Sequence, residues 1–445
     1  MHEDLIAAID GLFPSVQAGL ARFVSIPSVS APDFDPAPVR ASAELTATLL
    51  EGAGLRSVSL LEIEGAHPAV FGEAPGPPGS PTVLLYAHHD IQPPGDEAAW
   101  TSPPFTPVER GGRLYGRGSS DDKAGLMVHV AALTALRDAM PVHVKVIVEG
   151  EEEIGSPHMA ELLSRYGDRL GADTVVIADS ANWRIGQPAL TTSLRGLIDC
   201  VVEVRTAQHG VHSGMFGGPL IDALTVLAHL LATLHDEHGR PTVEGLVSRD
   251  ALALDLTEAE LREQASVVEG LRLAGSGTLT SRIWMQPAIA VLAIDAPPVA
   301  EAINQLVPVA RAKVSVRLAP GDDPRRAMRA LEAHLRARVP WGADLRFVPG
   351  AQADPFELRI KGRSYEAFHQ GLAAAWGQSA IDMGVGGTIP LVAALAERYP
   401  EASILLTGVG DPTSRWHGPD ESQDLEELRR GCLAEAIALR LIGTA

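Results

Sequence analysis

One stretch of the sequence decides the fold: Val83-Leu84-Leu85-Tyr86-Ala87-His88-His89-Asp90. Its first four residues are apolar and do not alternate with polar ones, which is typical of a strand buried on both faces of a sheet. Two imidazoles and a carboxylate follow within the next four residues. The stretch therefore predicts a buried strand that carries metal-ligand side chains to its carboxyl end.

Three further apolar runs, rich in β-branched residues, predict strands of the same kind: Val144 to Val148, Thr174 to Ile177 and Ile404 to Thr407. Helical patterns stand among them, such as Ala124 to Ala139 and Met159 to Tyr166. This alternation is typical of an α/β sheet covered by helices on both faces. We therefore predict an α/β fold with a mixed, helix-covered sheet.

The other three strands also have ligand-type residues at their ends. Glu149 through Glu153 end the second strand, Asp179 follows the third, and the segment from Asp411 to His417 follows the fourth. Loops at the carboxyl ends of strands in open α/β sheets converge on one crevice. Taken singly, a lone His or a run of Glu is more often a surface feature. Such clusters at four strand ends together indicate one shared site.

The middle of the chain has a different pattern and predicts a second domain. Its strands and helices follow the order βα, then ββ, then αβ, which is the split βαβ arrangement of a ferredoxin-like layer. The predicted elements are Ile198 to Arg205, Pro219 to His235, Ile289 to Ile294, Lys313 to Leu318, Asp323 to Arg338 and Asp344 to Val348. We expect residues 197–352 to be an α+β insertion. Residues 1–196 and 353–445 then form one discontinuous domain, with Leu358 to Trp376 as a helix of it.

An acidic pair, Asp121-Asp122, stands just before the predicted helix that begins near Lys123. A carboxylate in this place also satisfies the free N–H groups of a helix start, so capping is one interpretation. Two metal ions about 3.5 to 4 Å apart, however, need a bridging carboxylate between them. We predict that Asp121 is this bridge.

The set of candidate ligands contains imidazoles and carboxylates but no thiolate. Such a set fits Zn²⁺, Mn²⁺ or Co²⁺ rather than a structural zinc site of the Cys type. In the pattern His88-x-Asp90, the carboxylate can accept a hydrogen bond from the imidazole and fix its tautomer. We interpret the neighbouring His89 and Asp122 as structural residues.

Composition excludes several classes of function. The 445 residues carry a formal charge of −20, and we find no basic patch for nucleic acid or an anionic membrane surface. We expect no secretory signal and no membrane span, because neither pattern is present. Cys200 and Cys432 are the only cysteines and form neither a disulfide framework nor a CxxC site. A cytoplasmic enzyme is the expectation.

Four motifs together resemble one family of dinuclear zinc metallopeptidases. That family includes carnosine dipeptidase, peptidase V, carboxypeptidase G, acetylornithine deacetylase and succinyl-diaminopimelate desuccinylase. The resemblance spans nearly the whole chain, in order. The motifs are Tyr86-Ala87-His88-His89-Asp90-Ile91-Gln92-Pro93, Gly116-Arg117-Gly118-Ser119-Ser120-Asp121-Asp122-Lys123, Glu149-Gly150-Glu151-Glu152-Glu153-Ile154-Gly155-Ser156 and Gly386-Gly387-Thr388-Ile389-Pro390.

The resemblance implies a ligand set for two divalent ions in each subunit, with Zn²⁺ expected first and Mn²⁺ or Co²⁺ as alternatives. One ion would be held by His88 and Asp179, the other by Glu153 and His417, and Asp121 would bridge them. The segment before His417 departs from the usual family pattern. Asp411 is therefore an alternative ligand to His417.

The resemblance also implies the residues that act on the substrate. Glu152 would be the general base that deprotonates the attacking water, and Asp90 would orient His88. The segment from Gly210 to Gly218 resembles the part of a lid domain whose histidine, here His212, reaches into the active site of a partner subunit. The insertion is therefore expected to be a lid and dimerisation domain, and the protein a homodimer.

The remaining resemblances concern the substrate. Arg317 resembles the residue that binds its terminal carboxylate, and Gly387 with Thr388 resembles a backbone and hydroxyl cradle for the same group. The long polar segment between His238 and Ser281 resembles the enlarged lid of the carnosinase-like branch. Together these features imply hydrolysis of dipeptides. The alternatives are an N-acyl amino acid deacylase or carboxypeptidase of the same family, or a non-catalytic metal-binding or scaffold homologue.

Overall fold

The computed structural model describes residues 2–444 except 253, 359–361, 388 and 389. It separates the chain into two compact units. The first unit comprises Met1–Thr192, Leu358–Met383 and Ile389–Ala445, and the second comprises Ser193–Glu357 and Gly384–Thr388. Among the helices of the described residues, none has the length and apolar character needed to cross a membrane.

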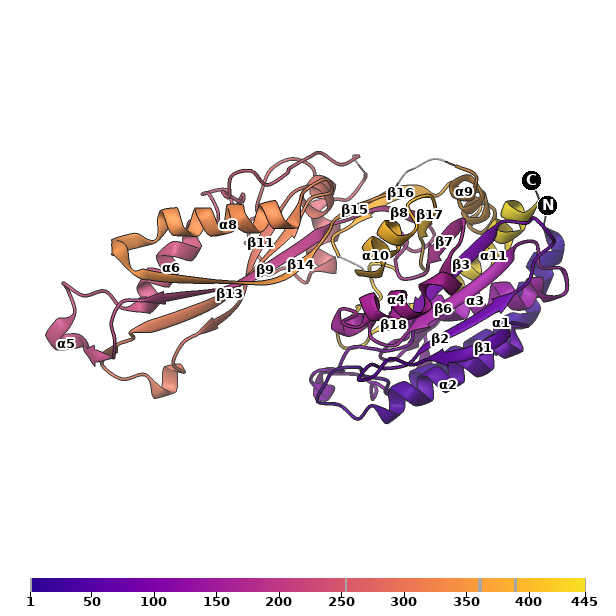
Figure 1. The fold of residues 1–445 in the computed structure, drawn as a ribbon, viewed down its shortest axis with the longest axis horizontal. Coiled ribbons are helices and arrows are strands. Elements are labelled where there is room, and N and C mark those ends of the chain that lie inside the picture. The colour runs from indigo at the N-terminus through magenta and orange to yellow at the C-terminus, as the bar shows by residue number, and fades with distance from the viewer. Residues whose placement is uncertain (1, 253, 359–361, 388–389, 445) are drawn as a thin grey trace. The chain divides into compact units, whose positions relative to one another are not determined.

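The first unit is built on a mixed sheet with the strand order β1-β2-β6-β3-β7-β17-β8 (Figure 1). The four strands at its centre, β6, β3, β7 and β17, are parallel to one another, whereas β1, β2 and β8 pair antiparallel with their neighbours. The strands are β1 (Arg56–Leu61), β2 (Ala69–Ala74), β3 (Thr82–His88), β6 (His143–Glu149), β7 (Thr174–Ile177), β8 (Ala189–Leu194), β16 (Ile381–Val385), which pairs with β8, and β17 (Ser403–Leu406). The predicted mixed α/β sheet is confirmed.

Helices cover this sheet on both faces. The chain crosses from β3 to β6 in one direction and from β6 to β7 in the other, so right-handed crossovers put α3 and α4 on opposite faces. Helices α1, α2, α9 and α11 join α3 in one connected layer, and α10 packs against α4. The helices are α1 (Glu3–Val24), α2 (Ala37–Gly52), α3 (Lys123–Leu136), α4 (Met159–Leu170), α9 (Arg363–Trp376), α10 (Pro390–Arg398) and α11 (Leu425–Gly443).

A small three-stranded sheet joins two distant parts of the first unit. Its order is β18 (Ser422–Asp424), β5 (Arg113–Tyr115) and β4 (Val108–Arg110), and β18 pairs antiparallel with β5. Two sequence segments about 300 residues apart are thereby held side by side, and each of them carries candidate metal ligands close to the pairing.

The second unit has an antiparallel sheet of the order β11-β13-β9-β14, with α6 and α8 against one face. Taken in chain order, this is the ferredoxin-like βαββαβ arrangement, so the predicted α+β insertion is confirmed as a fold. Its elements are β9 (Gly196–Arg205), α6 (Ala223–Ala232), β11 (Ala288–Asp295), β13 (Val309–Leu318), α8 (Pro324–Arg338) and β14 (Asp344–Ala353). Shorter pieces are β10 (Val211–His212), α5 (Ser213–Phe216), α7 (Glu258–Gln264), β12 (Gln305–Leu306) and β15 (Phe356–Glu357).

Most predicted boundaries differ from the structure by a few residues. The predicted helix from Leu358 begins only at Arg363, and residues 359–361 lie outside the described part of the chain. The predicted helix from Pro219 begins at Ala223, because the Asp222 side chain accepts the N–H of Thr225 and caps the helix there.

Candidate metal centre

The structure brings the five predicted metal ligands together in the first unit. His88 is the last residue of β3, Glu153 lies in a short 3₁₀ turn after β6, and Asp179 follows β7. Asp121 precedes α3, and His417 lies in the loop between β17 and β18. Strand ends therefore deliver His88, Glu153 and Asp179, as expected for the carboxyl edge of an α/β sheet, whereas Asp121 comes from a helix start and His417 from a loop.

The carboxylate of Asp121 lies between two imidazoles. Its Oδ1 is 3.1 Å from Nε2 of His88, and its Oδ2 is 3.0 Å from Nε2 of His417. Glu153 approaches the same His417 atom at 3.3 Å, and Asp179 approaches Nε2 of His88 at 3.9 Å. One carboxylate with an imidazole at each oxygen is the arrangement required of a bridging ligand.

Two overlapping groups of side chains have ligand atoms within 4.8 Å of one another. One group is His88, Glu152 and Asp179, and the other is His88, Asp121 and Glu153. The donors are imidazole nitrogens and carboxylate oxygens, the set that suits Zn²⁺, Mn²⁺ or Co²⁺. Four carboxylates with only two imidazoles form a negatively charged cluster, and burial makes such a cluster unfavourable without cations. The residues present therefore fit a pair of divalent ions.

The pKa values of the cluster show this crowding. Burial, together with the nearby Asp121 and Glu153 charges, raises the pKa of Asp179 to about 7, although His88 opposes the shift. Burial and then the Asp179 charge raise the pKa of Glu152 well above its usual value. Hydrogen bonds to Asp121 and Glu153 raise the pKa of His417 to about 10. The shifts have one cause, which is that burial and neighbouring carboxylates disfavour further negative charge at this site.

His88 is oriented through the main chain of Asp90 as well as its side chain. Nδ1 of His88 lies 3.1 Å from the Asp90 main-chain oxygen and 3.4 Å from its carboxylate. A carbonyl oxygen only accepts, so Nδ1 carries a hydrogen, and Nε2 is the ring atom that would coordinate a metal ion at this site. The carboxylate of Asp90 instead accepts the N–H groups of Glu152 and Glu153, at 3.2 and 3.1 Å. Asp90 thereby joins two strand ends, which the sequence pattern did not predict.

Of the two residues interpreted as structural, His89 bonds outside the ligand set and Asp122 bonds to the backbone of a ligand candidate. Nε2 of His89 donates to the main-chain oxygen of Pro68, and burial lowers the pKa of His89 to about 4. Asp122 accepts the N–H of His88. Asp411, the alternative ligand, pairs with Arg113 at 2.9 Å and belongs to neither group.

Sequence reasoning missed Gln92 as a residue of this site. Its side-chain amide donates to the main-chain oxygen of Glu153 at 2.9 Å and to the Glu153 carboxylate at 2.8 Å. Its own N–H reaches the other carboxylate oxygen at 3.2 Å. Gln92 therefore fixes the orientation of Glu153. The sequence feature that could have indicated Gln92 is its place four residues after His88 in the same motif.

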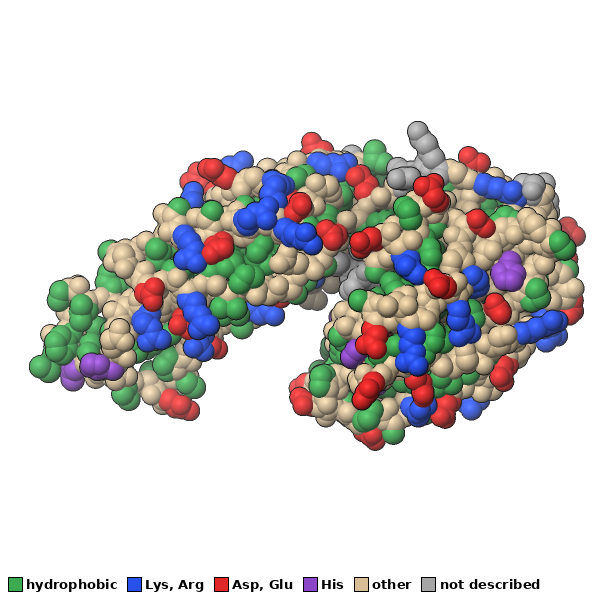
Figure 2. Space-filling view, viewed as in Figure 1, with side chains coloured by type: hydrophobic (Ala, Val, Ile, Leu, Met, Phe, Trp, Pro, Cys, Tyr) green, Lys and Arg blue, Asp and Glu red, His purple; other side chains and the backbone are tan. Residues whose placement is uncertain are grey.

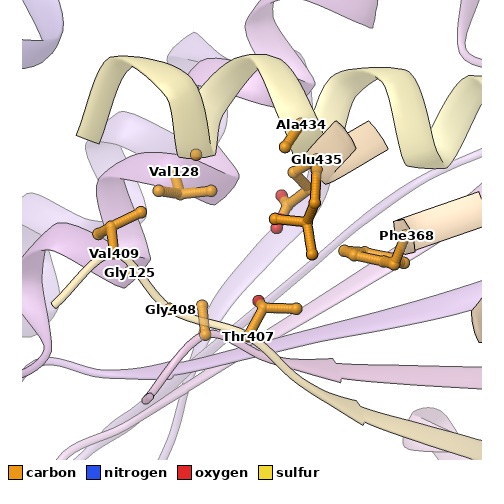
Figure 3. A pocket seen from close by; sticks show the side chains of 11 residues that line it. Gly125, Val128, Phe368, Thr407, Gly408, Val409, Ala434 and Glu435 are labelled. Carbon is orange, nitrogen blue, oxygen red and sulfur yellow. The ribbon is translucent and has the colours of Figure 1, made fainter. Parts of the chain in front are cut away.

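A small cavity lies behind the strand ends, between α3, α9, α11 and the segment from Thr407 to Val409 (Figure 3). Its volume of about 20 Å³ is enough for about one water molecule. It is therefore far too small to be the substrate site. Glu435, which lines it, pairs with the buried His129 on α3.

The remaining candidates belong to the second unit. His212 is exposed and caps α5, with Nδ1 accepting the N–H of Gly214 at 3.1 Å. In the neutral ring, the hydrogen is then on Nε2, which makes that atom a donor. Figure 2 shows histidines among hydrophobic side chains at the α5 end of this unit, where Met215 and Phe216 are exposed.

Arg317 lies near the end of β13, where it pairs in register with Leu197 of β9. A second arginine, Arg195, was not predicted. Burial, and then the neighbouring charge of Arg317, lowers the pKa of Arg195 to about 10, and its Nε donates to the main-chain oxygen of Gly386 at 3.4 Å. Gly387 is half-buried beside that residue, and Thr388 lies outside the described residues.

A mixed α/β sheet with clustered imidazoles and carboxylates at its strand ends, and a ferredoxin-like insertion, defines the class of a metal-dependent hydrolase. Residues 84–440 match the model of peptidase family M20/M25/M40, and the chain belongs to this family. The family predicted from the four motifs is confirmed.

Several characterised proteins are similar over most of the chain. The cysteinylglycine-S-conjugate dipeptidase of Corynebacterium striatum is 34% identical over 371 residues, covering 82% of each chain. The β-Ala-His dipeptidase of Rattus norvegicus is 29% identical over 377 residues, covering 80% of this chain and 75% of the relative. The solved structure of the dipeptidase Dug1p from Saccharomyces cerevisiae has a TM-score of 0.85 at 21% identity, covering 99% and 98%. This last similarity bears on the fold alone.

Proposed function

We propose that this protein is a dipeptidase that hydrolyses the amide bond of dipeptides with the help of two divalent metal ions. The observation that carries the proposal is the Asp121 carboxylate, held between His88 and His417 within a buried group of further carboxylates. The similar proteins named as dipeptidases support the choice of substrate within the family.

The proposed ligands divide between the two ions. His88 and Asp179 would hold one ion, Glu153 and His417 would hold the other, and Asp121 would contact both. The ions, Zn²⁺ in the first place and Mn²⁺ or Co²⁺ otherwise, supply Lewis acidity that lowers the pKa of the attacking water and polarises the scissile carbonyl. Asp90 keeps His88 in the tautomer whose Nε2 is free to bind, because Nδ1 donates to its main-chain oxygen.

Glu152 is the proposed general base. It belongs to the same close group as His88 and Asp179, and the bond from its N–H to Asp90 fixes its backbone. It accepts the proton of the attacking water and returns it to the leaving amine. No covalent acyl-enzyme is required, because water is the nucleophile.

The second unit supplies the proposed substrate-binding residues. Arg317, Gly387 and Thr388 hold the free carboxylate of the substrate, and the Arg195 guanidinium adds positive charge to the same place. A guanidinium offers parallel N–H donors to a planar carboxylate, and a substrate with a free terminal carboxylate is therefore proposed.

His212 is proposed to stabilise the oxyanion in the active site of a partner subunit. Its exposed Nε2–H is a donor with no role in the local turn, since Nδ1 alone caps α5. The exposed hydrophobic residues near it, Met215, Phe216 and Leu220, favour an interface in this region. The second unit is accordingly proposed as a lid and dimerisation domain of a homodimer, and the protein as a cytoplasmic enzyme.

A panel of substrates tests the proposal. Metal-stripped protein reloaded with Zn²⁺ or Mn²⁺ is incubated with Cys-Gly, β-Ala-His, tripeptides and N-acetyl amino acids, and kcat/KM is measured for each. Dipeptides are expected to have the highest values. A clear preference for N-acetyl amino acids would identify a deacylase instead, and no turnover of any substrate would favour a non-catalytic homologue.

A further inference from the structure

A buried ion pair, Arg117 with Glu421, lies next to the candidate metal centre but belongs to neither group of ligands. Both side chains are about 1% exposed. Arg117 stands four residues before Asp121, and Glu421 stands four residues after His417. The pair therefore connects the two chain segments that carry the bridging carboxylate and its second imidazole.

Both oxygens of the Glu421 carboxylate are used. One accepts from Nη1 of Arg117 at 2.5 Å. The other accepts two main-chain N–H groups, those of Ser120 at 3.1 Å and Asp121 at 3.2 Å. Glu421 thus holds the backbone of the very residue whose side chain lies between the two imidazoles.

Further bonds keep the Glu421 segment in one position against the Asp121 segment. The main-chain oxygen of Glu421 accepts the N–H of Gly116 at 2.9 Å, and the pairing of β18 with β5 begins one residue later. Nε1 of Trp416, the neighbour of His417, donates to Oγ of Ser120 at 2.9 Å. The backbone positions of Asp121 and His417 are consequently set by one shared network.

The charge of Arg117 explains why a carboxylate is needed at position 421. A buried guanidinium without a counter-charge is strongly unfavourable. Its remaining contacts, a bond to the main-chain oxygen of Pro93 and a position over the Trp100 ring, do not supply a full negative charge. Glu421 neutralises Arg117 with one oxygen and orients the Asp121 backbone with the other.

We propose that Glu421 is a positioning residue that sets the separation of Asp121 and His417, and with it the affinity for the ion that these two residues share. This inference rests on the proposed metal assignment, but not on the identity of the substrate. An amide at position 421 has only one acceptor oxygen, whereas the site requires two. Glu421→Gln keeps the shape of the side chain, but it can accept either from Arg117 or from the N–H groups of Ser120 and Asp121, not from both.

The test is a titration of metal-stripped protein with Co²⁺. Calorimetry gives the two Kd values, and the visible absorption spectrum reports the coordination of the bound ions. For Glu421→Gln we expect one of the two Kd values to rise at least about tenfold, as when other supporting partners of metal ligands are removed. The absorption spectrum of bound Co²⁺ should change as well. The melting temperature is measured in parallel.

Glu435→Gln is the matched control, because it also removes a buried carboxylate from an ion pair. Glu435 lies 2.9 Å from Nδ1 of His129 and contacts no candidate ligand. This variant should also melt at a lower temperature, but with both Kd values and the Co²⁺ spectrum of the wild type. If Glu421→Gln does not fold, Glu421→Asp is used instead. It keeps both oxygens on a shorter side chain and should raise the same Kd.

Wild-type Kd values and spectra in a folded Glu421 variant would overturn the inference. Equal changes in the Glu435→Gln control would also overturn it, because they would show a general effect of lost stability. Failure of the proposed function has a different result. A wild-type protein that binds two ions but hydrolyses no dipeptide would leave the role of Glu421 intact.

Discussion

The metal centre of the first unit and the substrate-binding candidates of the second are constructed in different ways. His88 is completely buried and Asp121 and Glu153 are nearly so, whereas the fifth ligand candidate, His417, is 56% exposed. Nδ1 of His88 donates to the main chain of Asp90, and the N–H of Gln92 donates to Glu153. The side chain of His212 is exposed, and its Nδ1 accepts a hydrogen bond from the nearby N–H of Gly214. Ligands that must hold cations against mutual repulsion need fixed positions, whereas a residue that meets only the substrate needs access. Substitutions in the two regions should therefore differ in their effects on metal binding, kcat and kcat/KM.

The largest effect is expected at Glu152. Glu152→Gln should retain both metal ions and lose about 10² to 10⁴-fold in kcat, the scale for removal of a general acid or base. Steady-state kinetics and metal analysis of the same sample measure the two quantities. Glu161→Gln, on the exposed side of α4, is the control and should behave as wild type. A Glu152→Gln enzyme with normal turnover would remove the proposed base.

A loss of about 10² to 10³-fold in kcat is expected for His212→Ala, the scale for one oxyanion donor. The control is His209→Ala, which changes an exposed histidine of the same loop. If His212 acts across a dimer, mixing His212→Ala with Glu152→Gln chains should restore activity in one of the two sites of each heterodimer. The absence of any recovery on mixing would argue against the partner-subunit role.

Arg317→Ala should act mainly on binding. Loss of a charge-assisted pair of hydrogen bonds to the substrate carboxylate corresponds to about 1.5–3 kcal/mol, or a decrease of roughly 10 to 100-fold in kcat/KM. The effect should disappear for a substrate whose carboxylate is amidated. Arg311→Ala, on the same strand but paired with Glu203, is the control. Equal losses for free and amidated substrates would contradict the assignment.

The smallest effect concerns stability rather than catalysis. Burial alone would lower the pKa of His129, but the Glu435 carboxylate outweighs it and raises that pKa. A raised histidine pKa stabilises the fold below its unfolded value of about 6.5, and the contribution is lost as pH rises through the folded value. The melting temperatures of wild type and Glu435→Gln should thus differ most near pH 6 and converge at high pH. A difference that does not vary with pH would show that the pair is not ionised.

The fold and the residues of the candidate metal centre could be predicted from the sequence where they depend on local sequence patterns. The four apolar runs correspond to β3, β6, β7 and β17 within two residues at each end, because buried parallel strands have no polar alternation. Their ends carry His88, Glu153 and Asp179 to one place for the same topological reason. The roles of these residues stay predictions until metal binding is measured.

Supporting contacts between distant segments were not predictable. Glu421 holds the Asp121 backbone across 300 residues of sequence, and nothing in its own neighbourhood distinguishes it from a surface acid. Asp90 was expected to act through its side chain on His88, but the carboxylate lies closer to the N–H groups of Glu152 and Glu153. Arg195 follows β8 and gains significance only from the neighbouring Arg317. Such roles arise from tertiary packing, which local patterns do not encode.

The cluster around Asp121 is proposed to bind two divalent ions on which dipeptide hydrolysis depends. The most direct measurement is a titration of chelator-stripped protein with Zn²⁺ or Mn²⁺, in which bound metal and hydrolysis of a dipeptide are followed together. We expect no turnover in the stripped protein, two ions bound per chain at saturation, and restored activity. Full turnover without metal, or less than one ion per chain at saturation, would contradict it.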